Sequence, residues 1–228
     1  MEDLRRRLYY GVILFIVVFV VGFFLAGVIL KKILAFVQLD NVTLAASSPF
    51  QYIEMAMNVG FFLAIIASVP YIIFSFYSFI MPALTKSERI NLLKSIPVSI
   101  ALFVLGFFYG FSLLFYALEL LAAINVNLGI ANFWNIAQFL SQIFITSALL
   151  GLVFEFPLLL TLLIKLGMIT SQNLKERRRI AYFSMLFLVA LLPPTDVLTL
   201  VGMALPLVLL YEGTIVLNSK EHYVWTRA

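Results

Sequence analysis

The chain has 228 residues and a formal net charge of +4, with 64% hydrophobic residues, 11% charged residues and a mean hydropathy of +1.10. Soluble domains usually carry about 25% charged residues, so this composition excludes an ordinary soluble protein and predicts an integral membrane protein. The sequence has no cysteine and one histidine, His222, which argues against disulfides, thiolate or histidine metal sites and histidine-based catalysis in the membrane. We therefore expect no metal and no cofactor.

Six apolar segments are candidates for membrane-spanning helices. They predict an all-α, polytopic membrane protein with a single transmembrane domain over residues 1–228. The predicted helices are roughly Leu8–Leu30, Glu54–Ile80, Lys94–Leu118, Ile136–Ile164, Ile180–Leu192 and Val197–Leu217. Pro70, Pro157 and Pro206 lie inside three of them and are expected to bend them. Bent helices of unequal length predict a cupped shape rather than a compact cylinder.

The distribution of Lys and Arg predicts the orientation of the chain. All but two of these 15 residues lie near the termini or around the second–third and fourth–fifth connections, and the exceptions are Lys31 and Lys32. Because positive residues accumulate on the cytoplasmic side, we expect both termini to be cytoplasmic. The loops at Ser48-Pro49-Phe50, at residues 125–134 and at residues 193–196 are then outside. Ser48 and Pro49 are typical of a helix start and are expected to cap the second helix.

The fifth and sixth predicted helices are short. Thirteen residues separate Arg179 from Pro193 and 15 separate Asp196 from Glu212, which correspond to about 20 and ~22 Å of helix. A hydrocarbon core is about 30 Å thick. Either the bilayer is thinner beside this hairpin, or other parts of the protein cover it.

Glu155 is the most specific polar signal, because it lies deep in an apolar run two residues before Pro157. An ionisable group near the bilayer centre costs at least ~2.5–3.5 kcal/mol and must face protein or water. One interpretation is a functional polar centre that receives a peptide segment, holds a proton or perturbs the membrane. The other is a structural carboxyl bonded to a neighbouring helix, for example to Gln138, Gln142, a serine or a threonine.

Several other acids lie at positions that suggest a role. Glu2, Asp3 and Glu88 lie in basic sequence, where they form either local ion pairs or a carboxylate cluster for a basic peptide, since carboxylates bind guanidinium forks. Asp196 either caps the sixth helix or has a role in translocation. Glu212 is expected to extend its side chain from the inner end of the sixth helix toward the membrane interface.

Several stretches together resemble the TatC family, the core subunit of the twin-arginine protein translocase. They are Asp3-Leu4-Arg5-Arg6-Arg7-Leu8, Ser48-Pro49-Phe50, Pro82-Ala83-Leu84 with Lys86-Ser87-Glu88-Arg89, Phe154-Glu155-Phe156-Pro157, Gly167-Met168-Ile169-Thr170 and Pro193-Pro194-Thr195-Asp196-Val197. The resemblance implies six helices with both termini in the cytoplasm and a location in the cytoplasmic (inner) membrane. It implies a non-enzymatic receptor that binds twin-arginine signal peptides and exports folded proteins with the proton-motive force.

The resemblance also implies roles for individual residues. The signal-peptide carboxylates match Asp3, with Glu2 beside it, and Glu88, and Arg5 matches the arginine of the N-terminal motif. Glu155 matches the intramembrane glutamate. Expected partners are signal peptides, membrane lipid, the single-span subunits TatA and TatB, with TatB on the fifth helix, and further copies in an oligomer; nucleic acid is not expected. A small proton- or ion-coupled transporter using Glu155 is the alternative function, and no catalytic pair supports an intramembrane enzyme.

Overall fold

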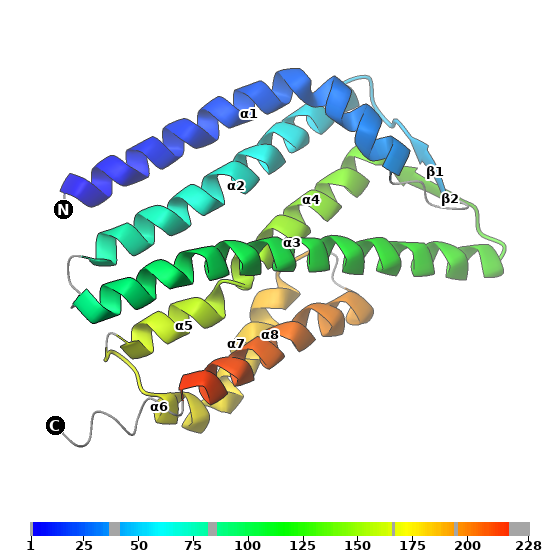
Figure 1. Cartoon of the computed structure of the whole chain (residues 1–228). Helices are drawn as coiled ribbons and strands as arrows, with labels where there is room; N and C mark the ends of the chain where they lie inside the picture. Colours follow the sequence, from blue (N-terminus) through cyan, green and yellow to red (C-terminus); the bar gives the residue numbers. More distant parts are fainter. Residues whose placement is uncertain (1, 37–41, 82–85, 166, 194–195, 219–228) are drawn as a thin grey trace.

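The computed structural model describes residues 2–36, 42–81, 86–165, 167–193 and 196–218 (Figure 1). In chain order the elements are α1 (Glu2–Phe36), β1 (Val42–Ala45), α2 (Gln51–Ile80), α3 (Lys86–Asn127), β2 (Asn132–Asn135), α4 (Ile136–Val153), α5 (Phe156–Lys165), α6 (Ser171–Glu176), α7 (Arg178–Ala190) and α8 (Val197–Asn218). The all-α class and the polytopic architecture are therefore confirmed, with a short strand pair added at one end.

Five segments of the described chain are long and apolar enough to cross a bilayer. They are Arg5–Ala35, Gln51–Ser78, Ser95–Asn127, Ile136–Lys165 and Val197–Asn218. The fourth segment combines α4 and α5. Helix α7 has 13 residues, about 20 Å of helix, and does not reach across a core of ~30 Å without bilayer thinning. The predicted six spans thus correspond to five helices of spanning length and one short helix.

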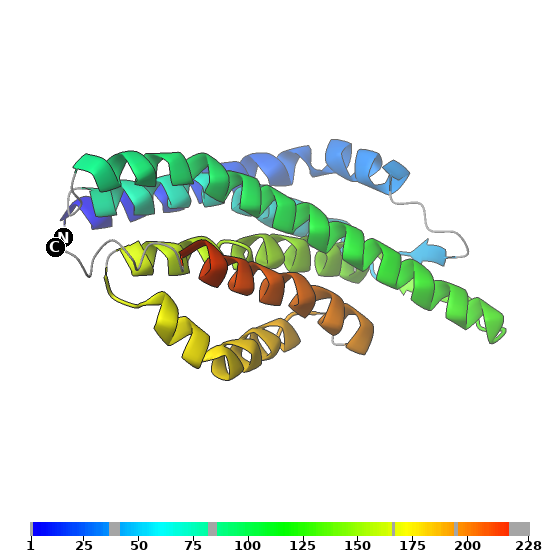
Figure 2. The ribbon, with the colours of Figure 1, turned by 60° about the horizontal axis from the view of Figure 1, so that its bottom comes forward.

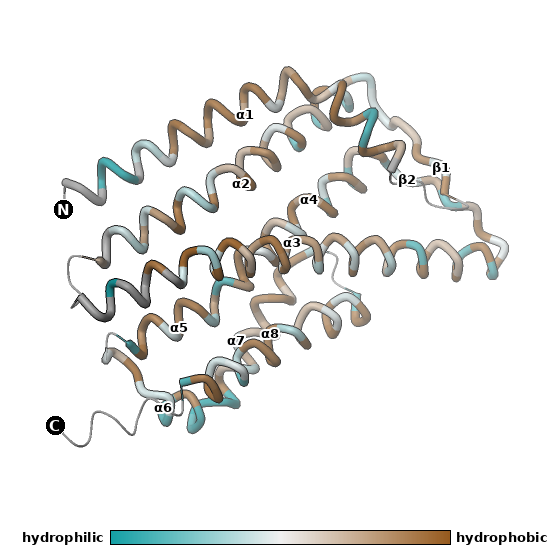
Figure 3. The backbone as a smooth tube through the Cα atoms, viewed as in Figure 1, coloured by the Kyte–Doolittle hydropathy of each residue, from teal (hydrophilic) through white to brown (hydrophobic). Residues whose placement is uncertain are grey.

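The start of α1, the end of α2, the start of α3 and the ends of α5 and α8 all lie at one end of the bundle (Figure 1). Hydrophilic residues gather at this end, at the start of α1 and around α6, while the middles of the helices are hydrophobic (Figure 3). We call this the basic end, because the Lys and Arg residues of the predicted cytoplasmic segments begin or end these helices.

At the other end of the bundle, a two-stranded parallel sheet that the sequence did not predict connects the loops before α2 and α4. Strand β1 pairs with β2 in the register Val42 with Asn132 through Ala45 with Asn135. Beside it, Gln51 donates a hydrogen bond to Asn135, and Asn135 donates one of 3.1 Å to the hydroxyl of Ser47. The loops before α2 and before α4 therefore form one small ordered unit.

The core lies where α3, α4 and α8 meet. Its largest fully buried side chains include Leu114, Leu140, Ile143, Met203 and Tyr211. Helix α1 packs against α2, and α7 packs against α8. In the turned view, α6 and α7 lie on the opposite side of α4, α5 and α8 from α1 and α2 (Figure 2). The helices are thus spread in layers, in keeping with the cupped shape expected from the sequence.

Candidate functional site

Glu155 lies in the break between α4 and α5, as Pro157 predicts. Helix α4 ends at Val153 and α5 begins at Phe156. Pro157 has no N–H to donate to the carbonyl of Val153, so the regular helical hydrogen bonding stops there. Helices α2 and α8, by contrast, continue through Pro70 and Pro206 without interruption.

The Glu155 side chain points into protein. It is 9% exposed, and its Oε2 atom accepts a hydrogen bond from the hydroxyl of Ser99 in α3. Its Oε1 atom has no hydrogen-bond partner among the described residues. Tyr77 of α2 lies close enough to interact with both Ser99 and Glu155. The polar centre therefore joins α2, α3 and the α4–α5 break.

Ser99 was not identified from the sequence, and Gln138 and Gln142, which were considered as partners, do not bond Glu155. The available signal was weak: Ser99 is a small polar residue in an apolar run, two positions after Pro97. Many transmembrane serines bond their own helix backbone, so a pattern cannot single out the one that faces a carboxyl group on another helix.

Two glycines bring α3 and α4 close together beside this centre. A Cβ atom on Gly106 would lie 2.5 Å from Cγ of Phe154, and one on Gly151 would lie 2.9 Å from Cε2 of Phe103. Real Cβ contacts are not that short, so both positions require the absence of a side chain. Small residues at membrane helix crossings allow such close backbone approach. The crossing holds Ser99 against Glu155.

The predicted signal-peptide residues lie at the basic end. Glu2 and Asp3 begin α1 and Glu88 is in the first turn of α3, and both helix starts are at the same end of the bundle (Figure 1). The side chains of these three acids lie outside the part of the structure that is described. The Arg5 side chain is exposed. Its neighbour Arg6 turns toward Tyr10, with the guanidinium 5.8 Å from the ring centroid.

Asp196 caps α8, as one of its two interpretations predicted. Its Oδ1 atom accepts a 2.9 Å hydrogen bond from the N–H of Thr199, and Oδ2 accepts a 2.5 Å bond from the Thr199 hydroxyl. These bonds satisfy an N–H group at the helix start that has no partner within the helix. A further role in translocation stays a prediction.

Ser48 caps the turn that leads into α2 rather than the first residue of the helix. The helix begins at Gln51, one residue after Phe50, and no side chain caps it at Phe50. The Ser48 hydroxyl accepts a 3.3 Å bond from the N–H of Phe50, and Pro49 lies in the turn before the helix. The side chain of Gln51 reaches back to accept a bond from Ser47 N–H. Ser48 and Pro49 therefore mark the start of α2 as expected, with the hydroxyl bonded one residue before the helix begins.

The Glu212 side chain is partly exposed and reaches α7, and its extension toward the membrane interface stays a prediction. It forms a 2.6 Å ion pair with Arg178 of α7 and accepts a 2.5 Å hydrogen bond from the hydroxyl of Tyr182. Helix α8 continues past Glu212 to Asn218 and has 22 residues. Even so, α8 is the shortest of the five spanning segments.

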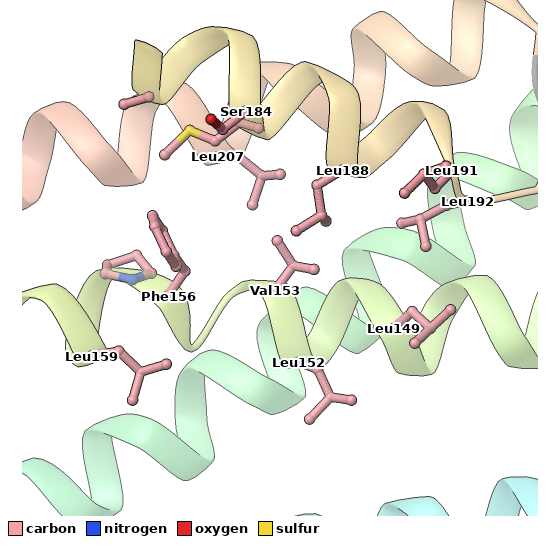
Figure 4. A pocket seen from close by; sticks show the side chains of 13 residues that line it. Leu149, Leu152, Val153, Phe156, Leu159, Ser184, Leu188, Leu191, Leu192 and Leu207 are labelled. Carbon is pink, nitrogen blue, oxygen red and sulfur yellow. The ribbon is translucent and has the colours of Figure 1, made fainter. Parts of the chain in front are cut away.

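An apolar cleft of about 580 Å³ separates α4 and α5 from α7 and α8 (Figure 4). Leu152, Val153 and Phe156 form one wall, and Leu188 and Leu207 belong to the other. The break that holds Glu155 therefore also shapes this cleft, although the carboxyl group itself turns toward α3. Among the described residues, no group of three His, Asp or Glu side chains is placed to hold a metal ion.

Comparisons with known proteins agree with the resemblance found in the sequence. The family model for the Sec-independent protein translocase protein TatC matches residues 1–206. The Bacillus subtilis Sec-independent protein translocase protein TatCy is 30% identical over 221 residues, which cover 96% of this chain and 87% of that protein. The Aquifex aeolicus TatC protein is 33% identical over 227 residues, which cover 96% of this chain and 92% of that protein.

A solved structure supports the same assignment. A crystal structure of the twin-arginine translocase receptor TatC superposes with a TM-score of 0.78 at 31% identity, and the match covers 96% of this chain and 97% of that one. The family model spans most of the chain, and the similarity extends over both sequence and fold. The protein is therefore a member of the TatC family of Sec-independent protein translocase proteins.

Proposed function

We propose that this chain is the receptor of a twin-arginine protein translocase and that its basic end binds signal peptides bearing two consecutive arginines. The observation that carries the proposal is that α1 and α3 both begin at this end (Figure 1), so Glu2 and Asp3 on one helix and Glu88 on the other share one face of the membrane. Carboxylates bind guanidinium groups by paired, charge-assisted hydrogen bonds, and two arginines need two such sites. Arg5 is proposed to belong to the same surface.

The proposed orientation puts the basic end in the cytoplasm. The charge distribution supports this, because the outer end carries only Lys31 and Lys32 of all the Lys and Arg residues. Both termini are then cytoplasmic, the strand pair is outside, and the protein resides in the inner membrane as one transmembrane domain over residues 1–228. Export of folded proteins from this side would draw on the proton-motive force.

The proposed partners are the single-span subunits TatA and TatB, in an oligomeric complex. The apolar cleft between α4–α5 and α7–α8 supports a contact with a transmembrane helix (Figure 4), because its volume of about 580 Å³ exceeds the roughly 400 Å³ of one helical turn about 10 Å wide. Helix α7 is one wall of this cleft, which agrees with TatB lying against the fifth predicted helix. Membership of a protein translocase family favours this function over the small-ion transporter.

A peptide-binding experiment tests the receptor function. We expect Glu88→Lys to abolish binding of a twin-arginine signal peptide to the purified chain in nanodiscs, and Glu88→Ala to weaken it at least tenfold. The reason is that a bidentate guanidinium partner is removed and, in the Lys variant, replaced by a like charge. Fluorescence anisotropy of a labelled peptide is the measurement.

Two controls make the result specific. Glu54→Ala removes an exposed acid from the first turn of α2, at the opposite end, and should leave the affinity unchanged. A peptide in which both arginines are lysines should bind weakly to every variant. Equal affinity of the wild-type chain, Glu88→Ala and Glu88→Lys for the twin-arginine peptide would remove Glu88 from the site.

A further inference from the structure

A second cleft, of about 260 Å³, lies between α1 and α2 near the basic end. Its walls are almost wholly apolar, with Val12 of α1 and Ile72 of α2 at its exposed rim. Arg7 lines the cleft at the end nearest the start of α1, and Ser68 lines it deeper along α2. Arg7 is thus the one charged residue among the described residues that line this mainly apolar groove.

The chain holds the Arg7 side chain across the two helices. Its Nη1 atom donates a 3.5 Å hydrogen bond to the carbonyl of Ser75 in α2, and the Tyr71 hydroxyl donates a 3.3 Å bond to the carbonyl of Arg7. A guanidinium has five N–H donors in a planar fork, an arrangement that suits a phosphate group. The Tyr71 bond holds the Arg7 backbone, and the long bond to Ser75 directs the guanidinium toward α2 at the mouth of the cleft.

Ser68 supplies a second polar group, deeper in the cleft. It is 3% exposed, and its hydroxyl has no hydrogen-bond partner among the described residues. Ser68 and Ser75 are seven positions apart along α2, which is roughly 10 Å of helix. A buried hydroxyl without a partner is costly, so a ligand oxygen in the cleft would be stabilised by it.

The size of the cleft limits its occupant. One turn of a helix about 10 Å wide occupies roughly 400 Å³, which is more than the cleft offers, so a signal-peptide or partner helix does not fit inside. Part of a single extended hydrocarbon chain, which is much narrower than a helix, does fit. Arg7 makes this cleft a basic pocket between two helices, and such pockets on the cytoplasmic side favour anionic lipids.

We propose that this cleft binds one anionic phospholipid of the cytoplasmic leaflet. Its phosphate lies on Arg7, its ester oxygens approach Ser68, and one acyl chain runs between Val12 and Ile72. The proposal uses the orientation given under the proposed function, but not the signal-peptide site. Lipid selectivity and peptide binding can therefore fail independently of each other.

A photocrosslinking experiment in vesicles tests the proposal. The full-length chain carries a benzophenone amino acid at Val12, or at Val17 as the matched control, since both are exposed on α1 and Val17 does not line the cleft. The vesicles contain equal amounts of phosphatidylglycerol and phosphatidylcholine with identical acyl chains. We expect the ratio of phosphatidylglycerol to phosphatidylcholine adducts, counted by mass spectrometry, to be at least threefold higher at Val12 than at Val17.

Charge variants identify the group responsible. Arg7→Gln should lower the ratio at Val12 to that at Val17, Ser68→Ala should lower it partly, and Arg6→Gln should leave it unchanged, because Arg6 turns toward Tyr10. The wild-type comparison of the two lipids requires no arginine variant, so it stands even if Arg7→Gln folds poorly.

Three outcomes would overturn the proposal. The first is an equal lipid ratio at Val12 and Val17 in the wild-type chain. The second is an unchanged lipid ratio at Val12 in a folded Arg7→Gln variant, which would remove the guanidinium from the site. The third is replacement of the lipid adduct at Val12 by an adduct to an added twin-arginine peptide, which would assign the cleft to the peptide.

Discussion

Ser99 and Glu155 come from helices that are distant in sequence and meet at the point where the fourth spanning segment is broken. The hydroxyl donates to one carboxyl oxygen, while the other has no partner among the described residues. In an apolar interior these two side chains stabilise the protein only when both are present, because removing either one leaves the other as a buried polar group without a partner. The bond therefore contributes to the position of α3 against the α4–α5 break.

A double-mutant cycle tests this coupling. We expect Ser99→Ala and Glu155→Leu each to lower the free energy of unfolding in detergent by about 1–3 kcal/mol, and the double variant to lose less than the sum. Each protein is titrated from a mild into a denaturing detergent, and circular dichroism follows its unfolding. The titrations give the loss in the free energy of unfolding for the two single variants and the double variant. Strictly additive losses would mean that the two side chains do not stabilise each other.

Export activity separates the structural interpretation of Glu155 from the functional one. Glu155→Gln keeps an oxygen that can accept from Ser99 but removes the ionisable group. If it retains full folded yield and loses export of a twin-arginine cargo, the carboxyl group acts in transport. Parallel losses of yield and export would assign Glu155 a structural role.

The sequence predicted the importance of Glu155, Pro157 and Asp196, because each interrupts an apolar run and few structures can accommodate such a residue there. It missed Ser99 and the Arg178 partner of Glu212, because both are contacts between different helices. The ion pair of Glu212 with Arg178 joins α8 to α7, and no spacing within either helix reveals it. Partners that meet only through the tertiary packing are the part of the site that a sequence alone does not predict.

At the scale of elements, apolar runs located the spanning segments and α7 but not their ends, and they did not predict α6. Helix α3 extends from Lys86 to Asn127, whereas its apolar run suggested Lys94–Leu118. A helix continues past the hydrocarbon core as long as its residues have a high helix propensity, and charged residues do not end it. Strands β1 and β2 were missed because each has four residues, too few for an alternating pattern to stand out.

The crossing of α3 and α4 gives a matched pair of glycine variants. Gly106→Ala introduces a Cβ atom 2.5 Å from Phe154, and we expect it to destabilise the protein by about 1–3 kcal/mol through overpacking. Gly213→Ala, in α8, meets nothing within 4 Å, and should be neutral or stabilise by up to about 1 kcal/mol through helix propensity.

The same unfolding titration measures both variants. A pronounced loss for Gly106→Ala with none for Gly213→Ala would show that close approach at the crossing matters. Equal effects would mean that the α3–α4 crossing relaxes readily around an added methyl group. Because the crossing positions Ser99 against Glu155, Gly106→Ala should also lower export more than Gly213→Ala.

For the whole molecule, the unequal helix lengths determine how it sits in a bilayer. Four spanning segments have 28 to 33 residues, α8 has 22 and α7 has 13. A helix about 20 Å long in a core of ~30 Å requires local thinning or cover by neighbouring protein. The apolar cleft lies beside α7, so a partner helix bound in the cleft would lie next to the thinned part of the bilayer.

The natural chain has no cysteine, so single introduced cysteines report the topology directly. Leu128→Cys lies between α3 and β2, Gln172→Cys is in α6, and Val197→Cys begins α8, and all three side chains are exposed. If α7 crosses the membrane, Leu128→Cys and Val197→Cys should react with an impermeant maleimide added to intact cells. Gln172→Cys should react only after the inner membrane is permeabilised.

This pattern would establish six crossings and a cytoplasmic basic end, since residues 172 and 197 flank α7. Labelling of Gln172→Cys and Val197→Cys from the same side would instead show that α7 lies within one leaflet and that the chain crosses five times.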